Sequence, residues 1–205
     1  MRRDDALRAV LAEARRAGAA VFAGNGLLCR AIHALADRPG VFYMYGSMSM
    51  SPSIALGYTL HTGRPAVAVE GDGNALMGLS ALPLAAVASP AFLHVVLDNG
   101  VYESTGGQPS ASARVDLCRI AAAAGYRSAA TATDREALTR LLREARARHG
   151  PSYVRVPVAV GDAPPPPRVP LHPREITRRF RAAAAPDTEP TTGVNCEPTT
   201  GTETA

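Results

Sequence analysis

The sequence predicts an α/β fold: a doubly wound, mostly parallel sheet with helices on both faces. Short apolar segments recur along the chain, segments with apolar residues at helical spacing separate them, and glycine, asparagine or aspartate follows several of the short segments. Short buried strands that alternate with helices are typical of parallel sheets, because each parallel connection crosses over through a helix. Ligands of such sheets bind beyond the carboxyl ends of the strands, so the residues that follow strands are the most informative.

The first half of the chain begins with a helix. Leu7, Val10, Leu11 and Ala14 have helical spacing, and acidic residues just before them favour the start of a helix. A proline at an early position favours the start of a later helix at residue 52. The predicted elements that follow are a strand over 19–23, a helix over 27–36, a strand over 41–45, a helix over 52–61 and a strand over 65–70.

The second half continues the alternation. It predicts a helix over 74–88, a strand over 92–97, helices over 115–124 and 134–149, and a last strand over 152–156. The 205 residues suit one domain of ordinary size followed by a tail. We therefore expect a single domain over residues 1–160.

The composition changes after this domain. Residues 161–173 are rich in proline and predict a stiff linker, and residues 174–185 predict a short basic helix with Ile176 and Phe180 on one face. Residues 186–205 contain the sequence EPTTG twice and predict a disordered tail. The domain carries 17 Arg and 12 acidic residues, the segment 161–184 carries five Arg and two acidic residues, and the tail carries four acidic residues and no basic one.

Composition excludes several classes of function. All 22 basic residues are arginine, which excludes a lysine Schiff base and a Walker-type phosphate loop. The net charge of +4 suits anionic ligands, but the excess is too dispersed to indicate nucleic acid. The arginines from Arg174 to Arg181 are more typical of a solvated helix than of an RNA contact. The five histidines have no metal-ligand spacing, and His33, His61, His94 and His149 are expected to be structural.

Cysteine usage and hydropathy indicate the compartment. Cys29, Cys118 and Cys196 are too far apart for a disulfide framework or a cysteine zinc site, so we expect a reducing cytoplasm. The acidic residues of the N-terminus do not fit a signal peptide. The most apolar segment, 81–97, is interrupted by two prolines and a histidine, so no membrane span is expected.

Two loops carry candidate chemistry. One strand runs into Gly71-Asp72-Gly73-Asn74, and the next strand runs into Asp98-Asn99-Gly100. Asp72 and Asn99 are 27 residues apart, which is the length of one helix plus one strand, so both side chains are expected at the same edge of the sheet. A carboxylate, an amide oxygen and a backbone carbonyl would leave room on Mg²⁺ for diphosphate oxygens and water. Both sequences are also ordinary turn sequences.

The combination of motifs resembles thiamine-diphosphate-dependent enzymes. The GDG sequence and the interval to Asn99 resemble the diphosphate and Mg²⁺ motif of that superfamily, over roughly residues 1–157. Within it, LDNGVYESTGGQPS looks most like phosphonopyruvate decarboxylases and the beta subunits of sulfopyruvate decarboxylases. GDG alone would be a weak signal, whereas the three features together are specific.

The resemblance implies roles for particular residues. Asp72 and Asn99 would bind Mg²⁺ through their side chains, and Val101 through its carbonyl. Gly46 would offer a carbonyl to the 4′-amino group of the cofactor, and Met48 would bend the cofactor into its V shape, although a plain packing role is the alternative for Met48. The implied cofactor-binding residues are Asn25, Gly26, Gly46, Ser47, Met48, Gly71, Asp72, Gly73, Asn74, Asn99, Val101 and Tyr102.

The substrate side is less defined. Glu103, Ser104 and Thr105 are candidate substrate contacts, with a solvated loop or a helix cap as the alternatives. Three positions depart from the family pattern: Ser49 stands where glycine is usual, Asn25 replaces threonine, and Cys29-Arg30-Ala31 replaces Ser-Arg-Glu. Backbone atoms do much of the cofactor binding, so these departures bear mainly on the identity of the substrate.

The resemblance also implies a reaction and a partner. The activity is decarboxylation of a 2-oxoacid to an aldehyde, with 3-phosphonopyruvate giving phosphonoacetaldehyde as the preferred reaction. Sulfopyruvate is the next substrate, and a repurposed cofactor-binding subunit is a further alternative. The superfamily supplies an activating glutamate from a pyrimidine-binding domain, for which this chain has no room. We therefore expect a partner subunit of similar size that brings this glutamate, since Glu70 and Glu103 belong to the diphosphate half.

A nicotinamide-binding oxidoreductase is the alternative from a different class of function. Gly24-Asn25-Gly26-Leu27-Leu28-Cys29 is close to the dinucleotide fingerprint between a strand and a helix, but cysteine replaces the third glycine and no acidic residue follows about twenty residues later. The sequence therefore favours thiamine diphosphate with Mg²⁺ over a nicotinamide cofactor.

Overall fold

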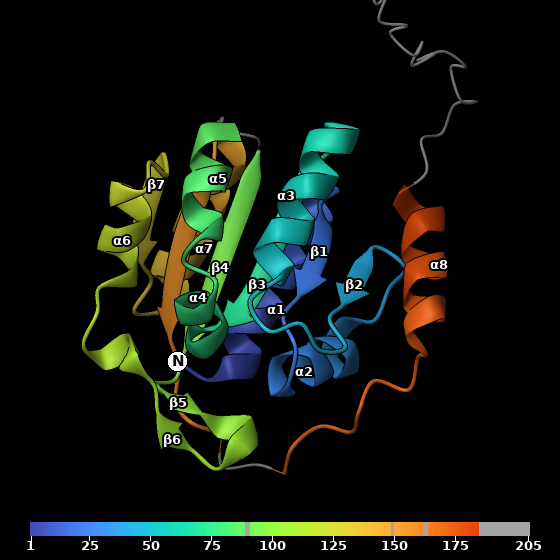
Figure 1. The fold of residues 1–205 in the computed structure, drawn as a ribbon, viewed down its shortest axis with the longest axis horizontal. Coiled ribbons are helices and arrows are strands. Elements are labelled where there is room, and N and C mark those ends of the chain that lie inside the picture. Colours follow the sequence, from blue (N-terminus) through green and yellow to red (C-terminus); the bar gives the residue numbers. More distant parts are fainter. Residues whose placement is uncertain (89–90, 149, 162–163, 185–205) are drawn as a thin grey trace, which may run out of the picture.

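The sheet confirms the predicted α/β class. A computed structural model describes residues 1–88, 91–148, 150–161 and 164–184. Within them, six strands form one sheet in the order β2-β1-β3-β4-β8-β7, and every neighbouring pair is parallel (Figure 1). The strands are β1 (Ala20–Ala23), β2 (Val41–Tyr43), β3 (Ala66–Gly71), β4 (Phe92–Asp98), β7 (Ser128–Thr131) and β8 (Ser152–Pro157).

Helices cover both faces of the sheet. One core cluster joins the strands to α1, α2 and α7, and a second cluster joins them to α3, α5, α6 and α8. Consecutive strand residues alternate between the clusters, as Val21 and Phe22 do in β1. The helices are α1 (Arg3–Arg16), α2 (Leu27–Ala36), α3 (Ser51–Thr62), α4 (Asp72–Met77), α5 (Ala81–Ala88), α6 (Leu117–Ala123), α7 (Arg135–Ala147) and α8 (Pro173–Ala184).

The single helix expected over 74–88 is wrong, because the structure divides it into α4 and α5. The break begins at Gly78, whose N–H bonds to the carbonyls of Asn74 and Ala75 at 2.9 and 3.2 Å. A Cβ on Gly78 would lie 3.0 Å from Ser49 in the loop before α3. The close approach of this loop therefore accompanies the end of the helix.

Two strand pairings were not predicted. β7 is an edge strand of small residues, with the sequence SAAT, so it lacks the apolar pattern that marks the other strands. The antiparallel hairpin of β5 (Val101–Tyr102) and β6 (Gln108–Pro109) is short and lies at the lower end of the sheet in Figure 1. This hairpin contains much of the STGGQ segment.

The segment after the sheet returns to the body of the domain. Val169 and Ile176 are buried in the first core cluster, and Phe180 is buried in the second. The Phe180 ring lies 5.1 Å from the ring of Phe22 and 5.4 Å from that of Phe42. One side of α8 is therefore packed, not solvated. The expected tail over 186–205, with both EPTTG sequences, lies outside the described residues.

The order of the strands marks a point where the chain reverses direction across the sheet. β1 lies between β2 and β3, so the connections on its two sides leave in opposite directions. Open α/β sheets bind ligands at such a switch point, outside the carboxyl ends of the strands. The loops after β1 and β3 are therefore the structural candidates for a site. No helix among the described residues has the length and apolar character to span a membrane.

Candidate functional site

A cavity lies at the switch point, where the loops after β1, β3 and β4 meet. It brings together most of the residues singled out from the sequence, although they come from four separate segments. Gly46 and Ser47 do not line it, although Met48 of the same loop does. The predicted residues that line the cavity are Asn25, Gly26, Met48, Gly71, Asp72, Gly73, Asn74, Asn99, Val101, Tyr102, Glu103, Ser104 and Thr105.

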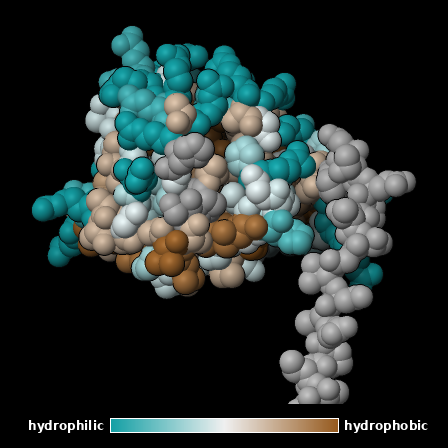
Figure 2. All heavy atoms as spheres, turned by 90° about the horizontal axis from the view of Figure 1, so that it is seen from above, coloured by the Kyte–Doolittle hydropathy of each residue, from teal (hydrophilic) through white to brown (hydrophobic). Residues whose placement is uncertain are grey.

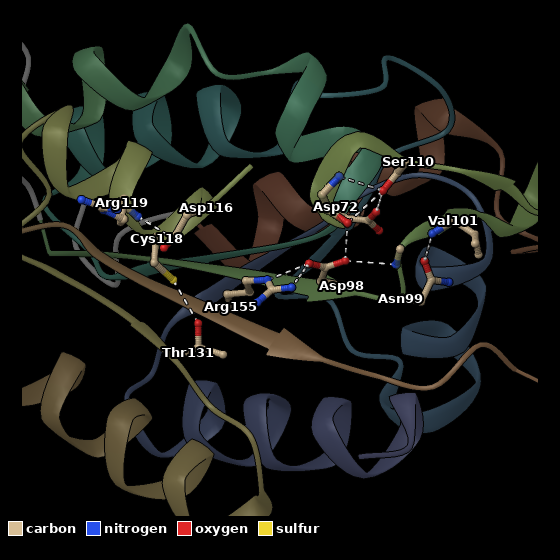
Figure 3. A network of polar contacts seen from close by, with 12 residues as sticks. Asp72, Asp98, Asn99, Val101, Ser110, Asp116, Cys118, Arg119, Thr131 and Arg155 are labelled. Atoms are coloured by element: carbon tan, nitrogen blue, oxygen red, sulfur yellow. Dashed lines mark hydrogen bonds and ion pairs between the residues drawn. The ribbon is translucent and has the colours of Figure 1, made fainter. Parts of the chain in front are cut away.

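Asp72 begins α4 directly after β3, and it is only 2% exposed. Its Oδ2 accepts a hydrogen bond from the Ser110 hydroxyl (Figure 3). Burial raises the pKa of Asp72, the bond from Ser110 opposes that change, and the nearby charge of Asp98 adds to it. Burial and a fixed partner therefore hold this carboxylate in a defined orientation.

Asp98 holds the neighbouring loop in place. It accepts hydrogen bonds from the Ser112 hydroxyl at 2.8 Å and from the Arg155 Nε at 2.7 Å. The Arg155 Nη2 also lies 2.6 Å from Asp98 Oδ2, so the guanidinium contacts the carboxylate through two nitrogens. The hydroxyl oxygens of Ser110 and Ser112 are 2.9 Å apart. A continuous series of polar contacts therefore links Asp72 to Arg155 (Figure 3).

Asn99 is oriented by groups on both sides of its amide. Its Oδ1 accepts a hydrogen bond from the Val101 N–H at 3.1 Å, and its Nδ2 donates one to Glu103 Oε2 at 2.9 Å. Arg3 Nη1 lies 3.5 Å from the same carboxylate. Glu103 therefore contacts a residue predicted to bind metal and an arginine from the start of the chain.

Gly73 lies directly against the ring of Tyr102. A Cβ there would lie within 2.9 Å of Cδ1 of Tyr102 and 3.3 Å from Cε of Met48. Real Cβ atoms essentially never approach another atom below about 3.0 Å, so a side chain would displace the Tyr102 ring. The missing side chain thus lets α4, the hairpin and the Met48 loop meet at the cavity.

The loop that carries Met48 is strained. Ser47 and Ser49 both have positive φ angles, 49° and 75°, which a residue other than glycine rarely adopts. The Ser49 N–H donates to Asn74 Oδ1 at 2.9 Å, which fixes the loop against α4. Backbone strain of this kind persists only where surrounding contacts maintain it, and it is most frequent at functional sites.

The donor set fits a magnesium ion that arrives with a phosphate. Asp72 offers a carboxylate and Asn99 an amide oxygen, which are the hard oxygen ligands that Mg²⁺ prefers. The described residues contain no group of three or more His, Cys, Asp or Glu that could hold a metal. A metal here therefore needs oxygens from another source, such as a diphosphate in the cavity that Asp72 and Asn99 line.

Sequence reasoning missed five residues around this cavity. Ser110 and Ser112 lie just beyond the STGGQ segment, and their only signal was proximity to it. Asp98 was noted only as part of a turn, while Arg3 and Arg155 had no motif. Asp98 and Arg155 pair across neighbouring strands, because β4 and β8 place Asp98 next to Pro157 and Val96 next to Arg155. Only the sheet register brings them together.

The fold and its switch-point loops define a ligand-binding α/β domain of the doubly wound class. Residues 25–156 match the family described as "Thiamine pyrophosphate enzyme, C-terminal TPP binding domain". The chain belongs to this family. The resemblance inferred from the GDG, Asn99 and STGGQ features is therefore confirmed.

The curated relatives include phosphonopyruvate decarboxylases and sulfopyruvate decarboxylases. The chain is 43% identical to phosphonopyruvate decarboxylase of Streptomyces hygroscopicus over 186 residues. This match covers 90% of this chain and 45% of that protein. The chain is 37% identical over 161 residues to the sulfopyruvate decarboxylase subunit beta of Methanothermobacter thermautotrophicus, which covers 78% of this chain and 84% of that subunit. The chain thus spans less than half of the first relative and most of the second.

Solved structures support the fold. Benzoylformate decarboxylase from Polynucleobacter necessarius superposes with a TM-score of 0.69 at 18% identity, over 80% of this chain and 34% of that one. A putative thiamin diphosphate-dependent enzyme from Mycobacterium smegmatis superposes with a TM-score of 0.62 at 26% identity, over 76% of this chain and 31% of that one.

Proposed function

We propose that this chain is the diphosphate-binding part of a thiamine-diphosphate-dependent decarboxylase, with 3-phosphonopyruvate as its preferred substrate. The observation that carries the proposal is the meeting of Asp72, Gly73 and Asn99 with Met48 at one switch-point cavity. The 43% identity to a phosphonopyruvate decarboxylase supports this substrate over other 2-oxoacids. Thiamine diphosphate, when bound, supplies the nucleophilic carbon and the electron sink that decarboxylation of a 2-oxoacid needs.

The residues of the cavity divide into two groups. Asp72, Asn99 and the carbonyl of Val101 would hold Mg²⁺, with Ser110 fixing the direction of the Asp72 carboxylate. The diphosphate would lie against the turn after β1 and the junction of β3 with α4. The residues of these two segments are Asn25, Gly26, Gly71, Gly73 and Asn74, and Tyr102 closes the cavity beside Gly73.

The strained loop before α3 would hold the aminopyrimidine end of the cofactor. In this assignment Met48 supplies the apolar wedge and Gly46 a backbone carbonyl, with Ser47 beside them. The bond from Ser49 to Asn74 couples this loop to the diphosphate loop, so both ends of the cofactor are held by one connected unit. Glu103, Ser104 and Thr105 would then lie on the substrate side of the cavity.

The activating carboxylate would come from a partner subunit. Glu70 is fully buried and bound to His94 at 2.9 Å and to Ser51 at 3.1 Å, so it does not face the cavity. Glu103 is engaged by Asn99 and Arg3. The relative from Methanothermobacter thermautotrophicus is named as a subunit beta, which supports a hetero-oligomer.

The surface of the domain also supports a partner. Figure 2 shows hydrophobic side chains gathered along one side of the molecule. Large hydrophobic residues of α3 and α5 are exposed, namely Leu60, Leu84 and Val87, and Val87 is 88% exposed. Apolar residues gathered on a surface are typical of protein interfaces.

We propose the cytoplasm as the compartment, which suits the free thiols of Cys29 and Cys118.

The test is turnover with and without a pyrimidine-binding subunit. The assembled enzyme should release CO₂ from 3-phosphonopyruvate, and the isolated chain should show little turnover. A higher kcat/KM on sulfopyruvate would favour the second candidate, which the 84% coverage of a sulfopyruvate decarboxylase subunit supports. Turnover of neither substrate, with intact cofactor binding, would favour a repurposed subunit. Titration with NADH should give no binding.

The metal assignment has a separate test. Asp72→Asn should abolish Mg²⁺-dependent binding of thiamine diphosphate, measured by calorimetry, because it removes the charged oxygen ligand. The matched control is Asp5→Asn, which makes the same change at an exposed position of α1. An unchanged affinity in Asp72→Asn would refute the assignment.

A further inference from the structure

A second hollow lies beside the cofactor cavity. The two share Asn25 and Gly26, the turn that follows β1. The second hollow is also lined by Arg30 of α2, by Tyr45 of the loop after β2 and by Arg168 of the segment between β8 and α8. In Figure 1 the last part of this segment passes below α2 on its way to α8. Arg168 lines the hollow together with Asn25 and Tyr45, which follow β1 and β2.

Among the described residues, the lining of the hollow carries two arginines and no acidic side chain. Within the described residues, the side chains of Arg30 and Arg168 form neither a hydrogen bond nor an ion pair, and no acidic residue lines the hollow. By contrast, Arg3 in the cofactor cavity lies 3.5 Å from Glu103, and Arg155 lies 2.6 Å from Asp98. Within the part of the chain that the structure describes, the arginines of the second hollow therefore differ from Arg3 and Arg155 in having no acidic partner.

Other donors face the same space. α2 has 10 residues and begins beside Asn25 and Gly26, so the positive end of its dipole lies at the turn that the two cavities share, while its first residues, Leu27 and Leu28, line the cofactor cavity. Tyr45 and Asn25 add a phenol and an amide. Val169 is 7% exposed and packs in the core, which anchors Arg168 beside the hollow. Two guanidinium groups with these donors suit a tetrahedral oxyanion.

We propose that this hollow binds the phosphonate or sulfonate group of the substrate. The inference rests on the proposed function, because it takes the substrate to be a 2-oxoacid with such a group. In both candidate substrates, a single methylene separates the strong-acid group from the keto carbon. Its receptor must therefore border the cofactor cavity, and the hollow meets that cavity at Asn25 and Gly26.

Substrate discrimination tests the receptor in the assembled holoenzyme. Arg30→Gln and Arg168→Gln should each lower kcat/KM for 3-phosphonopyruvate and sulfopyruvate by about 10- to 100-fold, as expected for losing a charged contact. Pyruvate lacks the strong-acid group, so its kcat/KM should change by less than about threefold, in the range of a surface charge change. Arg119→Gln, on the exposed surface of α6, is the control for net charge.

A binding measurement separates this inference from the proposed function. Phosphonoacetate and sulfoacetate are titrated into the cofactor-loaded protein, which requires no turnover. Binding that both arginine variants weaken, and that Arg119→Gln leaves unchanged, supports the receptor even where the wild-type enzyme decarboxylates neither acid. The tighter of the two anions then indicates whether the group is a phosphonate or a sulfonate.

Three results would overturn the receptor. The first is an equal loss of kcat/KM on pyruvate and on the anionic substrates. The second is a parallel loss of thiamine diphosphate affinity, which would assign the two arginines to the cofactor diphosphate. The third is normal turnover of 3-phosphonopyruvate or sulfopyruvate in both variants, which would remove this inference while leaving the decarboxylase proposal intact.

Discussion

The Ser110 hydroxyl donates a hydrogen bond to the carboxylate of Asp72 from a position 38 residues further along the chain. The bond joins the first residue of α4 to the segment that follows the β5–β6 hairpin. Ser110 also contacts Ser112, which reaches Asp98 and through it Arg155. The orientation of the Asp72 carboxylate, the candidate metal ligand, is therefore set by the distant segment that contains Ser110 and Ser112.

Replacement of Ser110 tests this link. Ser110→Ala should weaken Mg²⁺-dependent binding of thiamine diphosphate about 10-fold, as is typical when the hydrogen-bond partner of a metal ligand is lost. Burial raises the pKa of Asp72 and the bond from Ser110 opposes that rise, so the variant should lose more affinity as the pH falls. Calorimetry at two pH values measures both effects. Ser80→Ala, at an exposed position, is the control, and equal affinities for the two variants would contradict the link.

The strain at Ser49 predicts a stabilising substitution. Its φ of 75° is in the left-handed region, which costs about 1–2 kcal/mol for a residue with a side chain. Ser49→Gly should raise the free energy of unfolding by about 0.5–1 kcal/mol, since the greater freedom of glycine in the unfolded chain offsets part of the gain. Urea denaturation measures the change. The same substitution at Ser53, inside α3, should destabilise the protein, and a loss of stability in Ser49→Gly would show that the side chain is required.

The packing of Phe180 indicates that α8 contributes to the hydrophobic core. Its ring contacts the rings of Phe22, Phe42 and Tyr58, with centroids 5.1 to 5.6 Å apart. Phe180→Ala should lower the free energy of unfolding by about 3 kcal/mol, the lower end for a buried aromatic residue. Thermal unfolding provides the measurement, with Arg178→Ala on the exposed side of the same helix as the control. A midpoint equal to that of the control would mean that α8 contributes nothing to the fold.

Asp37 predicts a pH dependence of stability. Partial burial raises its pKa, but hydrogen bonds from Tyr43 and Arg179, with the charges of Arg179 and His33, outweigh burial and lower the pKa below 3.8. A lowered folded-state pKa stabilises the protein above the unfolded-state pKa, and this contribution disappears as the pH falls through the folded-state value.

Asp37→Asn should therefore cost about 0.5–1 kcal/mol at pH 7, a value that allows for solvent screening of the Arg179 contact. The cost should shrink toward zero below about pH 3. Urea denaturation across this range gives the comparison with the wild-type protein. A constant difference at all pH values would exclude the ionised carboxylate as the cause.

Periodicity was sufficient for the elements with a strong apolar pattern. The helix over 27–36 has the predicted bounds, and the strand expected over 92–97 is one residue longer. Periodicity failed where tertiary contacts determine the end of a helix. At Gly78 the loop of Ser49 packs against the end of α4. Periodicity also failed for β7, because small residues at a sheet edge resemble a loop.

The candidate site was predictable where a motif reports local geometry. The loops of Asp72 and Asn99 follow buried strands, so their meeting at one sheet edge follows from the parallel order. The contacts of Ser110 and Arg155 depend on how distant segments return to that edge, which no local pattern records. The return of Arg168 along the same edge belongs to this second kind.

The burial of Val169 and Phe180 has a practical consequence for the choice of chain boundaries. The family match ends at residue 156, and an expression fragment trimmed to that limit would lack the last described helix and the stretch leading to it. Such a fragment would expose the aromatic surface around Phe22 and Phe42 to water, which favours poor solubility. Fragments intended for biochemistry should therefore extend at least to residue 184.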